Sequence, residues 1–125
     1  MNKILLIEDD LALTKLYRVA LESKGFQVEE AHDGTEGMQK IAGGGYDLVV
    51  LDLMLPGING FDILKDLRKA EATKNLPVVV LTNLTGPEVN NLPALGISDL
   101  VLKAAVTPAE FTERVEKVFA SAPNF

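Results

Sequence analysis

The chain has 125 residues, of which 47% are hydrophobic and 24% charged, and it contains no cysteine. This length suits one domain with a single core, and the composition is that of a folded globular protein. Lys and Arg number 12 against 18 Asp and Glu, a formal net charge of -6. We therefore expect no direct nucleic-acid binding, because such proteins need a basic face. The absence of cysteine excludes disulfides and thiolate metal sites, and it fits a cytoplasmic location.

The first predicted strand runs from Ile4 to Ile7, within the N-terminal sequence MNKILLIEDD. A continuous apolar run of this kind is typical of a strand covered on both faces. Because only four apolar residues precede the acids, the segment is neither a signal peptide nor a membrane span, and we expect no membrane insertion.

Helical periodicity follows the acids, and Gly25 is the expected stop of this first helix. Its predicted buried stripe consists of Leu13, Leu16, Tyr17, Ala20 and Leu21. The run from Phe26 to Ala31 is weaker and alternates more, which predicts an edge strand.

The middle of the chain contains two further helices around a buried strand. Asp33 and Glu36 have capping-box spacing, which predicts a helix that ends at the glycines 43–45. Leu48 to Leu51 is the next continuous apolar run and predicts a strand. The stripe of the following helix is Phe61, Leu64 and Leu67.

The last third of the chain repeats the alternation, with strands predicted at Val78 to Leu81 and at Leu100 to Leu102. Between them a fourth helix begins near Thr85, but Pro93 leaves it short or distorted. The segment 107–110, TPAE, combines a cap, a proline and a glutamate and is the clearest helix start. The expected buried face of this fifth helix is Phe111, Val115, Val118 and Phe119.

Five alternations of strand and helix with short connections predict one α/β domain. We expect a doubly wound, five-stranded parallel sheet with helices on both faces. No linker or repeat interrupts the pattern. The domain is therefore expected to cover residues 1–125, with a core over 3–120 and a tail at 121–125.

Polar side chains follow the predicted strands at their carboxyl ends, the edge where open parallel sheets bind ligands. They are Glu8, Asp9 and Asp10 after the first strand, Asp52 after the third, Thr82 after the fourth and Lys103 after the fifth. Several carboxylates in one place repel one another unless a cation intervenes. Oxygen ligands without His or Cys suit a hard ion such as Mg²⁺, and lysine and threonine suit a phosphoryl group.

With these residues in place, the chain resembles the receiver domains of bacterial two-component response regulators. The matching segments are KILLIEDD (3–10), AHDGTEG (31–37), YDLVVLDLMLPGINGFDIL (46–64), LPVVVLT (76–82) and LGISDLVLK (95–103). They span nearly the whole chain. The resemblance implies a flavodoxin-like sheet with the strand order 2-1-3-4-5.

The resemblance also implies phosphorelay chemistry. Asp52 would accept a phosphoryl group from a sensor histidine kinase or phosphotransfer protein, and Lys103 and Thr82 would hold phosphoryl oxygens. The implied ligands of Mg²⁺, or of Mn²⁺ in its place, are Glu8, Asp9, Asp52 and the backbone carbonyl of Met54. The domain would be a self-phosphorylating and slowly self-dephosphorylating signalling domain, not a turnover enzyme.

The implied output is a change in a protein-interaction surface. A downstream protein would bind the face formed by the fourth helix, fifth strand and fifth helix, which begin at Thr85, Leu100 and Thr107. A homodimer is a further option. Because no output domain follows residue 120, the chain is expected to be a stand-alone regulator or a fragment of a longer one.

Three positions depart from the family pattern. Ala104 follows Lys103, where the family usually has a proline after a cis bond; a cis bond before alanine costs about 3 kcal/mol. Leu100 occupies the position of an aromatic ring that swings inward on activation. Asn83 follows the threonine, where alanine is common. These departures leave open both the aim of the lysine and the readout.

Some polar and glycine positions have simpler interpretations. We expect Asp10 to cap the first helix and His32 to face solvent. Gly57 and Gly60 are expected to serve turn geometry rather than ligand binding.

Two other function classes remain. A pseudo-receiver would use the same fold as a phosphorylation-independent binding or dimerisation module, which Leu100 and Ala104 favour and the intact acids oppose. A hydrolase that forms an aspartyl-phosphate is disfavoured, because the chain has no cap domain and no second positioned acid beyond Asp52.

Overall fold

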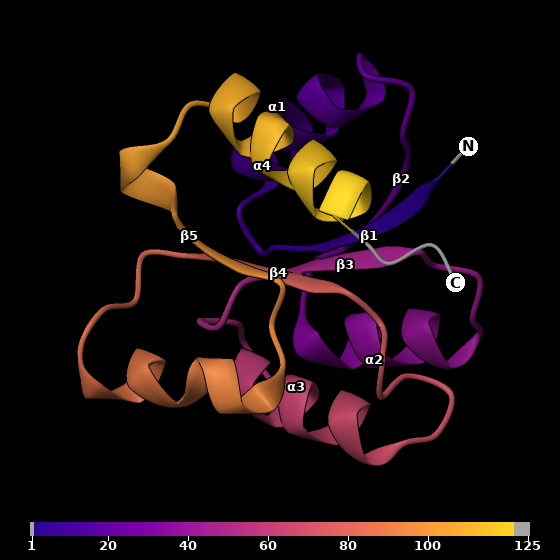
Figure 1. Ribbon diagram of the computed structural model, residues 1–125, viewed down its shortest axis with the longest axis vertical. Coiled ribbons are helices and arrows are strands. Elements are labelled where there is room, and N and C mark those ends of the chain that lie inside the picture. The colour runs from indigo at the N-terminus through magenta and orange to yellow at the C-terminus, as the bar shows by residue number, and fades with distance from the viewer. Residues whose placement is uncertain (1, 122–125) are drawn as a thin grey trace.

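The computed structural model describes residues 2–121. One parallel sheet has the order β2-β1-β3-β4-β5. Its strands are β1 (Lys3–Ile7), β2 (Gln27–Ala31), β3 (Leu48–Leu51), β4 (Val78–Thr82) and β5 (Asp99–Leu102). The helices are α1 (Leu11–Glu22), α2 (Gly34–Ala42), α3 (Gly60–Lys69), α4 (Pro108–Ser121) and the 3₁₀ helices η1 (Pro87–Leu95) and η2 (Lys103–Ala105). Figure 1 shows α1 and α4 on one face of the sheet and α2, α3 and η1 on the other. The predicted doubly wound fold and strand order are confirmed.

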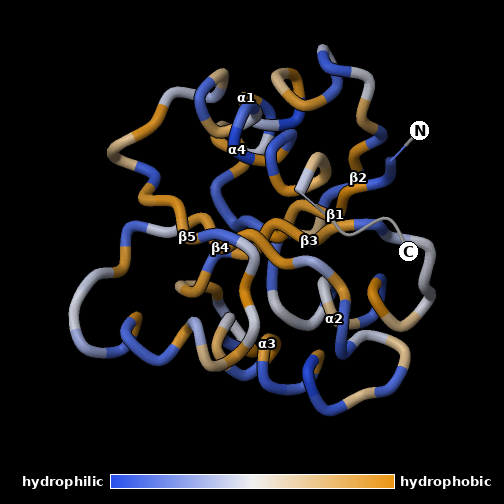
Figure 2. The backbone as a smooth tube through the Cα atoms, in the orientation of Figure 1, coloured by the Kyte–Doolittle hydropathy of each residue, from blue (hydrophilic) through white to orange (hydrophobic). Residues whose placement is uncertain are grey.

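The core lies in two layers, one on each face of the sheet. Alternate side chains of β1 enter different layers: Ile4 and Leu6 pack with the residues of α1 and α4, and Leu5 and Ile7 pack with those of α3. All four are fully buried. Figure 2 shows the resulting hydrophobic centre and the hydrophilic outer turns of the helices. The continuous apolar runs therefore reflect coverage from both sides.

The predicted helix starts are confirmed at three places. The Asp10 carboxylate accepts hydrogen bonds from the first turn of α1, and the Asp33 carboxylate accepts one from the N–H of Glu36 at 2.7 Å. At the start of α4, Thr107 Oγ1 accepts from the N–H of Glu110, and Glu110 Oε1 accepts from the N–H of Thr107. These bonds satisfy backbone donors that the first turn of a helix leaves unpaired. No helix within residues 2–121 is long and apolar enough to span a bilayer.

The predicted stripe of α1 is wrong at Leu16, which is 54% exposed. The helix instead buries Thr14, Tyr17 and Leu21. The Tyr17 ring packs edge-on against Phe111 of α4, with ring centroids 5.1 Å apart. This contact fixes the rotation of α1 and turns Leu16 outward.

Strand β5 also differs from the expectation of a strand covered on both faces. Only Val101 is buried, and Leu102 is 38% exposed, because β5 forms the second edge of the sheet. The prediction that Phe26 to Ala31 is an edge strand is confirmed by the outer position of β2.

The ends of the helical segments also differ in part from the predictions. Helix α1 ends at Glu22, before Gly25. The fourth helical segment, η1, contains Pro93 and has no side-chain cap, as the prediction of a short or distorted helix requires. Ser121 belongs to α4 rather than to a tail, and the rest of the expected tail lies outside the described residues.

Candidate functional site

The acidic residues meet at the carboxyl ends of the two central strands. Ile7 of β1 pairs with Leu51 of β3, so the next residues, Glu8 and Asp52, leave the sheet side by side. Glu8 and Asp52 are 1% and 4% exposed, whereas Asp9 is exposed. One carboxylate oxygen from each of the three lies within 4.8 Å of the others. The structure thus brings together the three predicted carboxylate ligands.

Lys103 reaches this cluster from the edge of the sheet that β5 forms. It begins η2 after β5, and its ammonium lies 2.7 Å from Asp52 Oδ2 and also contacts Glu8 Oε1. Burial raises the pKa of the Glu8 carboxyl. Burial alone lowers the pKa of Lys103, but its contacts with the Asp52 and Glu8 carboxylates outweigh it, and the net pKa is raised. Lys103 therefore keeps its positive charge beside the two carboxylates.

Thr82 is fully buried as the last residue of β4. It pairs with Leu102, which places it beside the start of the segment that carries Lys103. Its Oγ1 accepts a hydrogen bond from the N–H of Leu84 at 3.2 Å, so the hydroxyl keeps its own proton to donate.

The loop after β3 is shaped by the Asp52 carboxylate and by two glycines. Asp52 Oδ1 accepts from the N–H of Met54 at 3.1 Å, while the Met54 side chain is 58% exposed. Gly57 has φ +76°, as its predicted role in a turn requires. Gly60 acts differently, because a Cβ there would lie 2.5 Å from the Asp52 carbonyl oxygen and the Leu53 Cα. A close approach of α3 to the strand end therefore fixes this loop.

The first departure from the family pattern, at Ala104, is resolved by the backbone. No peptide bond in residues 2–121 is cis, so the bond between Lys103 and Ala104 is trans. The N–H of Ala104 donates to Asn83 Oδ1 at 3.0 Å. Both residues stand out individually in the sequence as departures, but no sequence pattern predicts this contact.

His32 is half-buried with its side chain 38% exposed, so the prediction that it faces solvent is confirmed only in part. Its Nδ1 lies 3.3 Å from the Glu8 carbonyl oxygen and its Nε2 lies 3.3 Å from Glu30 Oε1. The position of β2 beside β1 explains this, because the residues after the two strands are neighbours. Asp10 caps α1 as predicted, and its N–H also donates to Glu8 Oε2 at 3.0 Å.

The donor set suits a hard divalent cation. Glu8 Oε1 is buried and makes no well-aligned hydrogen bond to any described residue, although it touches the Lys103 ammonium. Three carboxylates face one ammonium here, and none of the ligand atoms is nitrogen or sulfur. Mg²⁺ prefers this type of ligand.

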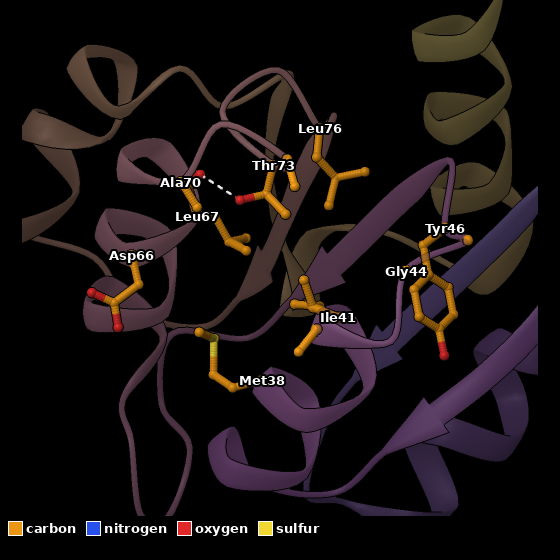
Figure 3. A pocket seen from close by; sticks show the side chains of 12 residues that line it. Met38, Ile41, Gly44, Tyr46, Asp66, Leu67, Ala70, Thr73 and Leu76 are labelled. Atoms are coloured by element: carbon orange, nitrogen blue, oxygen red, sulfur yellow. Dashed lines mark hydrogen bonds between the residues drawn. The ribbon is translucent and has the colours of Figure 1, made fainter.

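An apolar cavity of about 310 Å³ lies elsewhere, between α2, α3 and the segment that leads to β4 (Figure 3). Met38, Ile41 and Leu67 line it, and Asp66 is its one charged residue. None of the predicted site residues contributes to it. The candidate site is therefore the acidic cluster and not this cavity.

Comparisons with known proteins agree with this geometry. The family model for the response regulator receiver domain matches residues 4–116. A CpxR homolog from Haemophilus influenzae, a transcriptional regulatory protein, is 37% identical over 119 residues, which are 94% of this chain and 50% of that protein. The chain spans about half the length of the curated relatives it matches.

Two solved structures are similar over nearly the whole chain. The non-phosphorylated HemR receiver domain from Leptospira biflexa has a TM-score of 0.87 at 34% identity and covers 100% of both chains. TrrA from Thermotoga maritima, solved in complex with Mg²⁺ and BeF, has a TM-score of 0.81 at 28% identity and covers 94% of this chain and 99% of that one. The strand order, the acidic cluster and these matches lead to one conclusion: the chain belongs to the response regulator receiver domain family of two-component signalling.

Proposed function

We propose that this receiver domain accepts a phosphoryl group on Asp52 in a Mg²⁺-dependent reaction, and so relays a signal from a sensor histidine kinase or phosphotransfer protein. One observation carries the proposal. The buried Asp52 carboxylate lies within 4.8 Å of ligand oxygens of Glu8 and Asp9, and its Oδ2 accepts from Lys103 at 2.7 Å. An ion pair between Lys103 and Asp52 that served only stability would not require the Glu8 and Asp9 carboxylates so close, because the three acids repel one another.

The chemistry follows from in-line displacement. An Asp52 oxygen forms a bond to phosphorus as the bond from phosphorus to the donor's histidine nitrogen breaks, and the leaving imidazole keeps the electron pair and takes a proton. Glu8, Asp9, Asp52 and the Met54 carbonyl would hold Mg²⁺, which offsets the negative charge of the phosphoryl oxygens when bound.

Lys103 and Thr82 would stabilise the product. The lysine ammonium can move from the Asp52 carboxylate to a phosphoryl oxygen with little displacement, since it already lies 2.7 Å from Oδ2. The free hydroxyl proton of Thr82 can be donated to another phosphoryl oxygen. Both residues lie at the ends of neighbouring strands, so their movement would be passed to the face formed by η1, β5 and α4. That face would bind the downstream protein, in the cytoplasm and without membrane insertion.

The phosphorylated form should be long-lived. Met54 and Leu84 are the residues two beyond Asp52 and Thr82, and both are apolar. Apolar side chains at these two positions would keep attacking water from the phosphoryl group. A half-life of only seconds for the purified phosphoprotein in Mg²⁺ would contradict this.

A small phosphodonor with Mg²⁺, followed by intact-protein mass measurement, tests the proposal. The wild type should gain one phosphoryl group, and a chelator should prevent the gain. Asp52→Asn should gain none, whereas Asp66→Asn, at an exposed acid on α3, should behave as the wild type. An unchanged mass of the wild type, or an equal gain by Asp52→Asn, would refute the proposal.

A phosphorylation-independent module is the second candidate function. Leu100 is aliphatic and half-buried in β5, and η1 is a 3₁₀ helix rather than an α-helix. Either feature would alter a readout that depends on a swinging aromatic ring. Partner binding of equal strength with and without the phosphodonor would favour this candidate.

A further inference from the structure

The ends of β4 and β5 are linked beyond their last paired residues. Thr82 and Leu102 form the final pair of the ladder. One residue further, the Asn83 side chain crosses between the two segments, and its Oδ1 accepts from the N–H of Ala104 at 3.0 Å. This bond joins the residue after Thr82 to the residue after Lys103.

The Ala104 N–H has no acceptor in its own turn, and because Ala104 is exposed, water would take the place of Asn83. Ala104 lies in the single turn η2 (Lys103–Ala105), and the first N–H groups of a 3₁₀ helix have no acceptor within the helix. The residue before η2, Leu102, supplies no side-chain cap. Because residue 104 is not proline and its peptide bond is trans, the N–H is present and faces Asn83. The asparagine therefore acts as a cap supplied from a neighbouring strand end.

The backbone of η2 is the base from which Lys103 reaches the acids. Its ammonium must extend past β4 to contact Asp52, which follows β3. A lysine side chain is long and has many rotamers, so the position of its backbone limits where its charge can lie. The cap at Ala104 holds that backbone at a fixed separation from the Thr82 segment.

We propose that Asn83 is a positioning residue for the phosphoryl-transfer site. Its bond to the Ala104 N–H orients the Lys103 side chain toward Asp52 and holds the Lys103 backbone beside the Thr82 segment. Its effect on rate rests on the proposed function above, whereas its effect on the geometry does not. Asn83 itself contacts none of the reacting groups.

Two substitutions separate the hydrogen bond from the bulk of the side chain. Asn83→Leu keeps a similar shape without an acceptor, and Asn83→Asp keeps an acceptor at the same atom. Asn91→Leu, at an exposed asparagine in η1, is the matched control. With a small phosphodonor and Mg²⁺, Asn83→Leu should slow phosphorylation about threefold to tenfold, the range that one net hydrogen bond supports. Asn83→Asp, measured at raised salt to screen its charge, and Asn91→Leu should stay within about twofold of the wild type.

A second comparison tests whether Asn83 acts through Lys103. In a Lys103→Ala background, Asn83→Leu should cause no further slowing, because the group that it positions is gone. Equal slowing by Asn83→Leu in both backgrounds, or no slowing in the wild type, would overturn the inference. Thermal unfolding of every variant shows whether the fold is retained.

NMR of the unphosphorylated protein tests whether Asn83 positions Lys103 even if no phosphoryl group is gained. The Ala104 amide should exchange faster with solvent in Asn83→Leu but not in Asn83→Asp. The nuclear Overhauser contact between the Lys103 ε-methylene and the Asp52 β-methylene should weaken in Asn83→Leu alone. If the wild type gains no phosphoryl group, the proposed function fails while these signals still judge the inference. An unchanged contact in Asn83→Leu would refute the positioning role.

Discussion

The two halves of the strand-end site are built by different means. The acidic half lies at the ends of β1 and β3, where residues 4–7 and 48–51 are at most 1% exposed. The other half lies at the ends of β4 and β5. Strand β4 is fully buried, but β5 has one buried residue and η1 has no side-chain cap. A dense core leaves little freedom, whereas sparse packing permits local rearrangement. The buried carboxylates Glu8 and Asp52 are thus held rigidly, and the segment of β5 and η2 that carries Lys103 is the part suited to move.

Directional polar bonds add to the packing at the amino ends of β4 and β5, which lead to this half of the site. Arg68 of α3 donates to five backbone carbonyls, those of Thr73, Lys74, Leu76, Leu95 and Gly96. Arg114 of α4 holds Asp99 of β5 through two bonds of 2.6 and 2.7 Å. Each bond can be broken by one substitution, so the comparison between the halves can be tested residue by residue.

The largest effect is expected at Gly60, in the acidic half. In Gly60→Ala, the new Cβ would lie 2.5 Å from the Asp52 carbonyl oxygen, so α3 or the strand end must shift. We expect a loss of about 3 kcal/mol in the free energy of unfolding, measured by urea denaturation. Gly43→Ala is the control, because its Cβ meets only Lys40 O at 3.3 Å and its φ is -71°. Equal stability of the two variants would show that the close approach does not constrain this half.

The next effect is expected at Arg68, in the β4–β5 half. Arg68→Met should cost about 2 kcal/mol of unfolding free energy, because several carbonyls lose a charged donor. Hydrogen exchange should speed up in η1 and β5 but not in β1. The exposed neighbour Lys69→Met should change neither quantity. Equal faster exchange in β1 would mean that the two halves unfold together, contrary to the comparison.

The acidic half is also the half that the sequence predicts well. Burial on both faces leaves continuous apolar runs, and a parallel sheet brings the residues after its strands to one edge. Glu8 and Asp52 are therefore found from pattern alone. The bond between Asn83 and Ala104 joins residues 21 positions apart, and no local pattern marks such a contact. The prediction that Leu16 is buried is wrong for a similar reason, since the rotation of α1 depends on its contact with the Phe111 ring of α4.

A smaller effect is expected at Arg114. Its ion pair with Asp99 is partly exposed. Arg114→Lys removes the bidentate hydrogen bonding to the Asp99 carboxylate while keeping the positive charge. We expect a loss of about 0.5 kcal/mol in unfolding free energy, which should shrink as salt is raised. The Leu100 segment of β5 should show the main change in hydrogen exchange, because Arg114 also donates to the Leu100 carbonyl. Arg18→Lys, at an ion pair of α1, should leave β5 unchanged.

The smallest effect is expected at Tyr46, before β3 and at the opposite end of that strand from Asp52. Its phenol donates to Glu29 Oε1 at 2.8 Å, and burial together with this bond raises the pKa of Tyr46 to about 12. Because the folded protein holds this proton more tightly than the unfolded chain, the contribution to stability is complete below pH about 10 and is lost as the pH rises through about 12.

Spectrophotometric titration of the phenolate should show this late ionisation, and Tyr46→Phe should remove it while leaving the signal of Tyr17. Phosphorylation of Asp52 should proceed at the same rate in Tyr46→Phe as in the wild type. An ionisation of Tyr46 near pH 10 would mean that its bond to Glu29 is not maintained in solution. A changed phosphorylation rate would mean that the start of β3 communicates with its end, and that the acidic half is less rigid than its packing implies.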